Sequence, residues 1–155
     1  MRPGLVLGAV GLTIAILGVP QLAQAQDAVQ KMFFEGDMVS GPGSPGPLCV
    51  LNSQYKHGQV VVWRVRILDQ TGKRLDAKDV KSAGIELPDG QKFSLHYGPH
   101  PKGKTDDYFW TTSWKIPDNY PTGTFAYKVV ATGLDGQAHD WSPFNVDMSE
   151  LTIVK

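Results

Sequence analysis

The sequence predicts an all-β protein, an antiparallel β-sandwich with an extended N-terminal arm. Three observations support this class. Apolar and polar residues alternate over several short segments, turn sequences separate these segments every eight to twelve residues or so, and no long segment has helical periodicity. The best helical candidate, residues 75–81, is only about two turns long. The pattern predicts about seven strands.

The clearest strand prediction covers residues 59–69. Here Val61, Trp63, Val65 and Ile67 share one face, because side chains of a strand alternate between its two sides, and we expect this face in the core. The other strands are predicted at 31–38, 83–87, 93–97, 108–114, 125–131 and 144–153, the last with a bend near Ser149, and tight turns are predicted at 69–72, 88–90 and 134–136.

The first 25 residues have the pattern of a secretory signal peptide. Arg2 supplies a positive charge at the start, and residues 4–20 form a nearly uncharged apolar run. Ala23 and Ala25 are small residues at the two positions that a signal peptidase recognises. An uncleaved membrane anchor is the alternative, although the run is short for a bilayer span. Cleavage after Ala25 implies a periplasmic or secreted protein whose chain begins near Gln26.

Residues 40–47, SGPGSPGP, cannot form regular structure, because three prolines and three glycines force an extended or turning path. This segment either links a short arm to the body or wraps along an edge. The predicted organisation is therefore a signal peptide at 1–25, an N-terminal arm at 26–47 and a β-sandwich at 48–155.

Charge and cysteine content exclude several classes. The 15 basic and 15 acidic residues balance, which argues against a nucleic-acid partner or an anionic membrane held by bulk charge. The single cysteine, Cys49, excludes a disulfide within the chain. Burial as a small apolar side chain, a thiolate ligand, and an intermolecular disulfide that joins two copies in a homodimer all remain open for Cys49.

Three stretches within residues 59–146 resemble bacterial immunoglobulin-like domains. They are VVVWRVRILDQTGKRLD, a strand that ends in LPDG, and WKIPDNYPTGTFAYKVVATGLDGQ. The resemblance implies an immunoglobulin-like antiparallel β-sandwich, without the paired cysteines of antibody domains. Such sandwiches serve in adhesion, ligand binding, chaperoning and redox-accessory roles, so the resemblance implies architecture and leaves the activity open.

One candidate is a metal-binding site. A Gly-Pro turn between His96 and His100 would bring two imidazoles toward one point, and His57 and Cys49 would complete a copper or zinc site. The alternative is a solvent-exposed loop that contains two histidines and binds no metal.

A second candidate site is a contact surface for a partner protein. His100, Lys102 and Lys104 lie in a polar loop between two predicted strands, and such loops often carry binding. Phe109 has the opposite parity to its aromatic neighbours, so we expect it to be exposed and to form a contact patch with Trp141 or Tyr120; the alternative is that these rings belong to a second core face.

Motifs of catalysis are absent from the sequence, including the Gly-x-Ser-x-Gly elbow, His-Glu-x-x-His and a phosphate-binding glycine loop. We therefore expect a non-catalytic module without a cofactor, which docks on a periplasmic or envelope protein. The alternative function is binding of copper or zinc through the His96/His100 pair.

Overall fold

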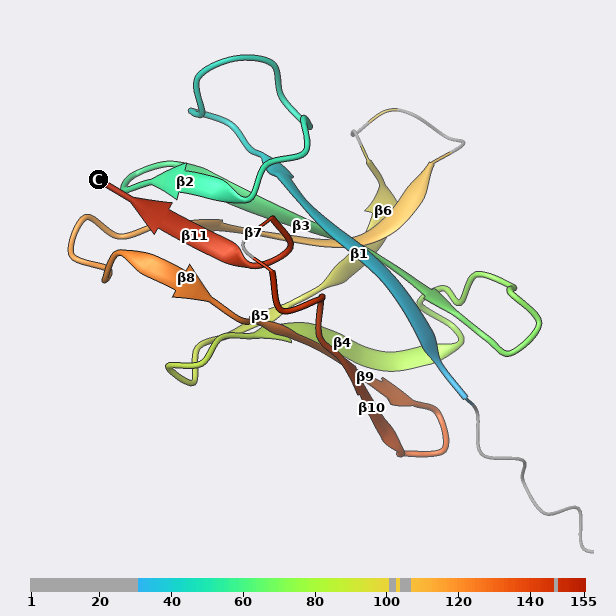
Figure 1. Ribbon diagram of the computed structural model, residues 1–155. Helices are drawn as coiled ribbons and strands as arrows, with labels where there is room; N and C mark the ends of the chain where they lie inside the picture. The colour runs from blue at the N-terminus through green and yellow to red at the C-terminus, as the bar shows by residue number, and fades with distance from the viewer. Residues whose placement is uncertain (1–30, 101–102, 104–106, 147) are drawn as a thin grey trace, which may run out of the picture.

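The computed structural model describes residues 31–100, 103, 107–146 and 148–155. Every regular element in these residues is a β-strand, and the eleven strands form three sheets (Figure 1). The predicted all-β class is thus confirmed for the described residues. They contain no helix long and apolar enough to cross a membrane. The predicted signal peptide lies outside them.

The first sheet is antiparallel throughout. It contains, in spatial order, β1 (Phe33–Ser40), β3 (Val60–Leu68), β7 (Tyr108–Lys115) and β6 (His96–Pro99). The clearest strand prediction corresponds to β3, where Val61, Trp63, Val65 and Ile67 are all at most 1% exposed. Residues of the predicted arm form β1, which pairs with β3 along its whole length.

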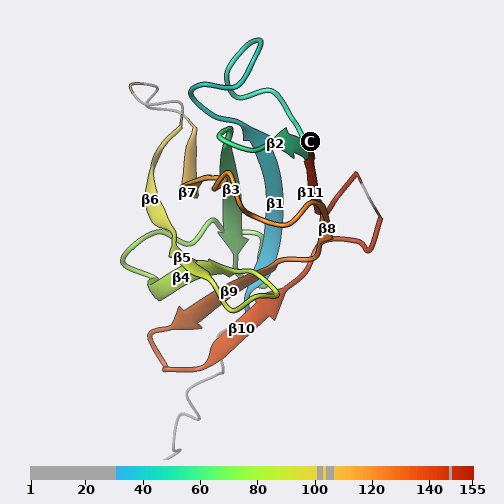
Figure 2. The ribbon, with the colours of Figure 1, turned by 90° about the vertical axis from the view of Figure 1, so that its left-hand side faces the viewer.

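The second sheet packs against the first across a shared core (Figure 2). It contains, in spatial order, β10 (Ala138–Trp141), β9 (Lys128–Gly133), β4 (Val80–Glu86) and β5 (Lys92–Ser94). Trp63 of the first sheet joins the two layers. The centroid of its ring lies 5.8 Å from that of Phe93 and 6.0 Å from that of Tyr127, distances typical of favourable aromatic pairs.

The third sheet covers part of the same core. It contains β2 (Gln54–Lys56), β11 (Leu151–Val154) and β8 (Gly123–Phe125), in that order. The pair β2 and β11 is parallel, whereas β11 and β8 are antiparallel. Tyr55, Leu151 and Ile153 point inward from this sheet and are at most 1% exposed.

Two predicted strands are each divided between two sheets. The segment 93–97 passes from β5 in the second sheet to β6 in the first, and the segment 125–131 passes from β8 in the third sheet to β9 in the second. The alternation of apolar residues continues through both changes, because each half turns the same set of side chains toward the shared core. These divisions account for two of the additional strands in the described residues, and the other two, β2 and β10, correspond to no predicted strand.

One expectation about local structure is wrong, and the best helical candidate, residues 75–81, forms no helix. Asp76 Oδ1 accepts a hydrogen bond of 2.7 Å from the Lys78 amide, which favours a turn that leads into β4. The strand expected at 144–153 begins only at Leu151, because Phe144 and Met148 alternate without facing the core and are 84% and 87% exposed.

Candidate functional site

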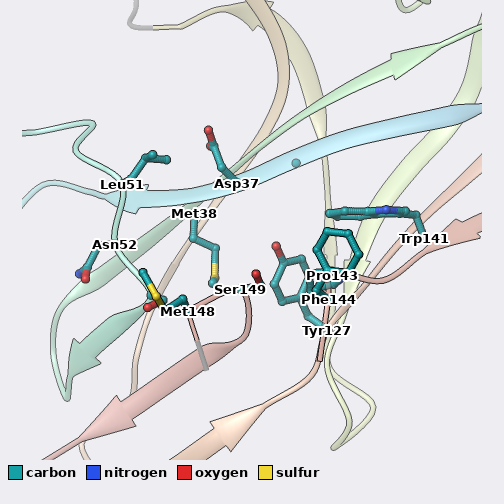
Figure 3. A pocket seen from close by; sticks show the side chains of 12 residues that line it. Asp37, Met38, Leu51, Asn52, Tyr127, Trp141, Pro143, Phe144, Met148 and Ser149 are labelled. Atoms are coloured by element: carbon teal, nitrogen blue, oxygen red, sulfur yellow. The ribbon is translucent and has the colours of Figure 1, made fainter. Parts of the chain in front are cut away.

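A cavity of about 410 Å³ opens beside β1, the outermost strand of the first sheet (Figure 3). One wall comes from β1 and the turn that follows it, which contribute Met38 and Asn52. The opposite wall comes from Trp141, the last residue of β10, and from Pro143, Phe144, Met148 and Ser149, which precede β11.

Three apolar side chains surround the mouth of this cavity, and we call them the apolar rim: Leu51, Phe144 and Met148. They are 68%, 84% and 87% exposed and belong to the residues that line the cavity. Tight turns hold the loop that carries two of them, with the Ser149 amide donating to the Val146 carbonyl at 2.8 Å. Several large exposed apolar groups in one place are uncommon on a protein surface and mark binding regions.

Tyr127 lies at the floor of the cavity, at the point where the chain passes from β8 to β9. Its side chain is only 3% exposed. Burial, with a smaller contribution from the Asp37 carboxylate, raises the pKa of Tyr127 above its ordinary value. The hydroxyl therefore remains protonated at neutral pH and is available as a hydrogen-bond donor.

Trp141, which the sequence predicts to contact a partner, forms one wall of the cavity. Its ring packs on Gly36, where a Cβ atom would lie 3.0 Å from Trp141 Cζ3. The absence of a side chain at Gly36 thus allows β10 to place its last residue close to β1.

A second site lies on the outer face of the first sheet, where Cys49 Sγ is 3.4 Å from His100 Nε2. The Pro/Gly segment 40–47 turns back along β1, and the Cys49 amide donates to the Ser40 carbonyl at 2.9 Å. Cys49 has φ of 60°, a conformation that is uncommon outside glycine. His100 follows β6, and its amide donates to the Asp107 carbonyl at 2.9 Å.

Charged residues surround the Cys49–His100 pair. Arg64 donates two hydrogen bonds to the Asp37 carboxylate, at 2.8 and 2.6 Å, and this pairing raises the pKa of Arg64. Burial is the main reason that the pKa of His100 is lowered, and the positive charge of Arg64 adds to the effect. His100 is therefore neutral at pH 7, and its ring nitrogen can accept a thiol proton.

The expectation that Phe109 is exposed is wrong. Its parity is as predicted, and its side chain lies on the outer face of the sheet, but it is only 8% exposed. The guanidinium carbons of Arg64 and Arg66 lie 5.4 and 4.6 Å from the ring centroid, so two cations on the neighbouring strand cover the ring. Phe109 therefore supports the second site and offers little surface to a partner.

The turn expected between His96 and His100 is not found, because residues 96–99 form β6. His100 follows His96 by four steps along an extended strand, so their backbones lie about 13 Å apart, too far for both side chains to bind one metal ion. His57 is also elsewhere, with its Nε2 donating to the Tyr120 carbonyl at 2.8 Å. Among the described residues, no three His, Cys, Asp or Glu side chains lie where they could hold one metal ion.

The other contact residues that the sequence predicts do not form one site in the described residues. Lys102 and Lys104 lie outside the described residues, whereas His100 belongs to the Cys49 site. The sequence does not predict Met38 and Tyr127 as contact residues, since both have the parity of core residues. It also missed the apolar rim, whose alternating residues resemble a buried strand.

Comparisons of this chain with protein-family models and with curated proteins found no match.

Proposed function

We propose that this chain is an exported, immunoglobulin-like β-sandwich without catalytic activity, which docks on a periplasmic or envelope protein. The observation that carries the proposal is the apolar rim beside Trp141. Covering a large apolar side chain contributes roughly 1.5–3 kcal/mol, so a partner that covers the apolar rim gains several kcal/mol toward binding.

The strand order supports the immunoglobulin-like part of this proposal. In immunoglobulin domains, strands A, B, E and D form one sheet, and strands C, F and G form the other, with C′ added in variable-type domains. If β1, β3, β7 and β6 correspond to A, B, E and D, then β10, β9, β4 and β5 correspond to G, F, C and C′. This assignment follows the order of the strands along the chain.

Photocrosslinking in the native host tests the proposal. A photoreactive amino acid at Phe144 is expected to capture one envelope protein, and the same group at the exposed Lys78 is not. The captured protein, once purified, should bind the wild-type chain and lose at least tenfold in affinity with Met148→Asp. Turnover of ester, phosphate or glycoside substrates by the purified chain, or its recovery from the cytosol alone, would show that the proposal is wrong.

We propose transition-metal binding as a second role, through Cys49 and His100 and without His96. Typical bond lengths to sulfur and nitrogen place two tetrahedral ligands about 3.6 Å apart, close to the observed 3.4 Å. A copper or zinc ion held here would need further ligands from solvent or a partner. Metal analysis of the purified chain should detect the ion, and Cys49→Ser and His100→Ala should lose it while His96→Ala retains it. Equal metal content in all four proteins would eliminate this role.

A further inference from the structure

We propose that the cavity beside Trp141 binds a small, neutral, aromatic molecule whose carbonyl oxygen accepts a hydrogen bond from the Tyr127 hydroxyl. This is a ligand site in its own right, and it does not depend on a protein partner.

The Tyr127 hydroxyl has no hydrogen-bond partner among the described residues, although the side chain is only 3% exposed. The buried hydroxyls of Tyr55 and Tyr120 differ, because each donates to an oxygen, at 2.9 and 2.8 Å. Figure 3 shows the Tyr127 hydroxyl directed toward the space between Asp37, Met38 and Trp141. A ligand oxygen in the cavity would accept a hydrogen bond from this hydroxyl.

The lining of the cavity favours an aromatic ligand. Trp141 and Phe144 contribute rings, and Met38 and Met148 contribute thioether groups (Figure 3). Methionine sulfur makes favourable contacts with aromatic rings, and its flexible side chain adapts to the shape of a guest. The volume of about 410 Å³ lies within the range of ligand sites for small molecules.

The charge of the lining favours a neutral ligand. Asp37 is the one charged residue of the lining, and its two carboxylate oxygens accept hydrogen bonds from Arg64. The described lining therefore offers neither a free cation to an anionic ligand nor a free carboxylate to a cationic one. Because burial keeps Tyr127 protonated, the hydroxyl acts as donor and the ligand supplies the acceptor.

Three naphthalene probes test the inference on the full chain as the cell processes it. They are 2-acetylnaphthalene, which has the carbonyl, 2-ethylnaphthalene, which lacks it, and 2-naphthoate, which is an anion. We expect 2-acetylnaphthalene to bind about tenfold more tightly than the other two, with NMR shifts at the methyl groups of Met38 and Met148. Saturable binding that leaves both methyl signals unmoved, or three equal affinities, would overturn the proposal.

Two variants locate the contacts. Tyr127→Phe should weaken 2-acetylnaphthalene by about tenfold and leave 2-ethylnaphthalene unchanged, whereas Tyr108→Phe, a control outside the cavity, should change neither. Phe144→Ala removes an exposed ring and should weaken all three probes by a similar factor of about three, which keeps the test open if Tyr127→Phe does not fold. Unchanged affinity for the ketone in both cavity variants would show that this cavity is not the site.

Discussion

Cys49 Sγ and His100 Nε2 lie 3.4 Å apart although the two residues are separated by 51 positions in the chain. The Pro/Gly segment brings the thiol to this point, and the β6–β7 hairpin brings the imidazole. An imidazole nitrogen at this distance can act as general base when the thiol reacts with an electrophile.

We expect His100→Ala to slow the reaction of Cys49 with iodoacetamide at pH 7.5 by roughly three- to tenfold, the equivalent of one lost hydrogen bond. Because the chain has a single cysteine, the loss of free thiol reports on this site alone. His96→Ala is the matched control and should react at the wild-type rate. Equal rates in all three proteins would mean that the imidazole does not activate the thiol.

Gly41→Ala should destabilise the fold by about 1–3 kcal/mol, because the added Cβ would lie 2.7 Å from Val60 Cγ1 and 2.9 Å from the Val60 carbonyl oxygen. The backbone atom cannot move without disturbing the hydrogen bond from the Gly41 amide to that oxygen. Gly98→Ala is the control, since a Cβ there meets nothing within 4 Å. The free energy of unfolding, measured with urea, should separate the two variants, and equal stability would contradict the described path of the loop.

The apolar rim should contribute little to stability. Phe144→Ala is expected to change the free energy of unfolding by less than about 0.5 kcal/mol, because the ring is 84% exposed. Ile153→Ala, in contrast, should cost about 2–5 kcal/mol, since Ile153 is 1% exposed within the core. Thermal and urea unfolding measure both values. A large loss with Phe144→Ala would mean that the ring packs inside the fold.

The hydrogen bond from Tyr120 to Asp89, 2.8 Å long, predicts a dependence of stability on alkaline pH. Burial first, and Asp89 second, raise the pKa of Tyr120 to about 12, above the ordinary value of 10. Since the raised pKa favours the protonated form in the folded state, this contribution is complete below pH 10 and disappears as the pH rises to about 12. The difference in unfolding free energy between wild type and Tyr120→Phe should follow this course. A difference that stays constant from pH 8 to 12 would contradict it.

The two sites show where sequence patterns stop being informative. Alternation at residues 144–148 resembles alternation at residues 61–67, yet the first set faces solvent and the second the core. Likewise, the parity of Phe109 predicts the correct face of its strand, but the arginines on β3 determine that the ring is covered. A pattern of period two identifies side chains that share a face, and it carries no information about what lies over that face.

The sequence by itself determined the all-β class, the core face of β3, the irregular Pro/Gly segment and the turns, because these depend on neighbouring residues and on backbone preferences. Only the tertiary structure decided that Cys49 meets His100, that His96 does not, and that a cavity forms beside Trp141. Each of these depends on how strands far apart in the chain are placed in three sheets, and that placement is determined by packing around the shared core.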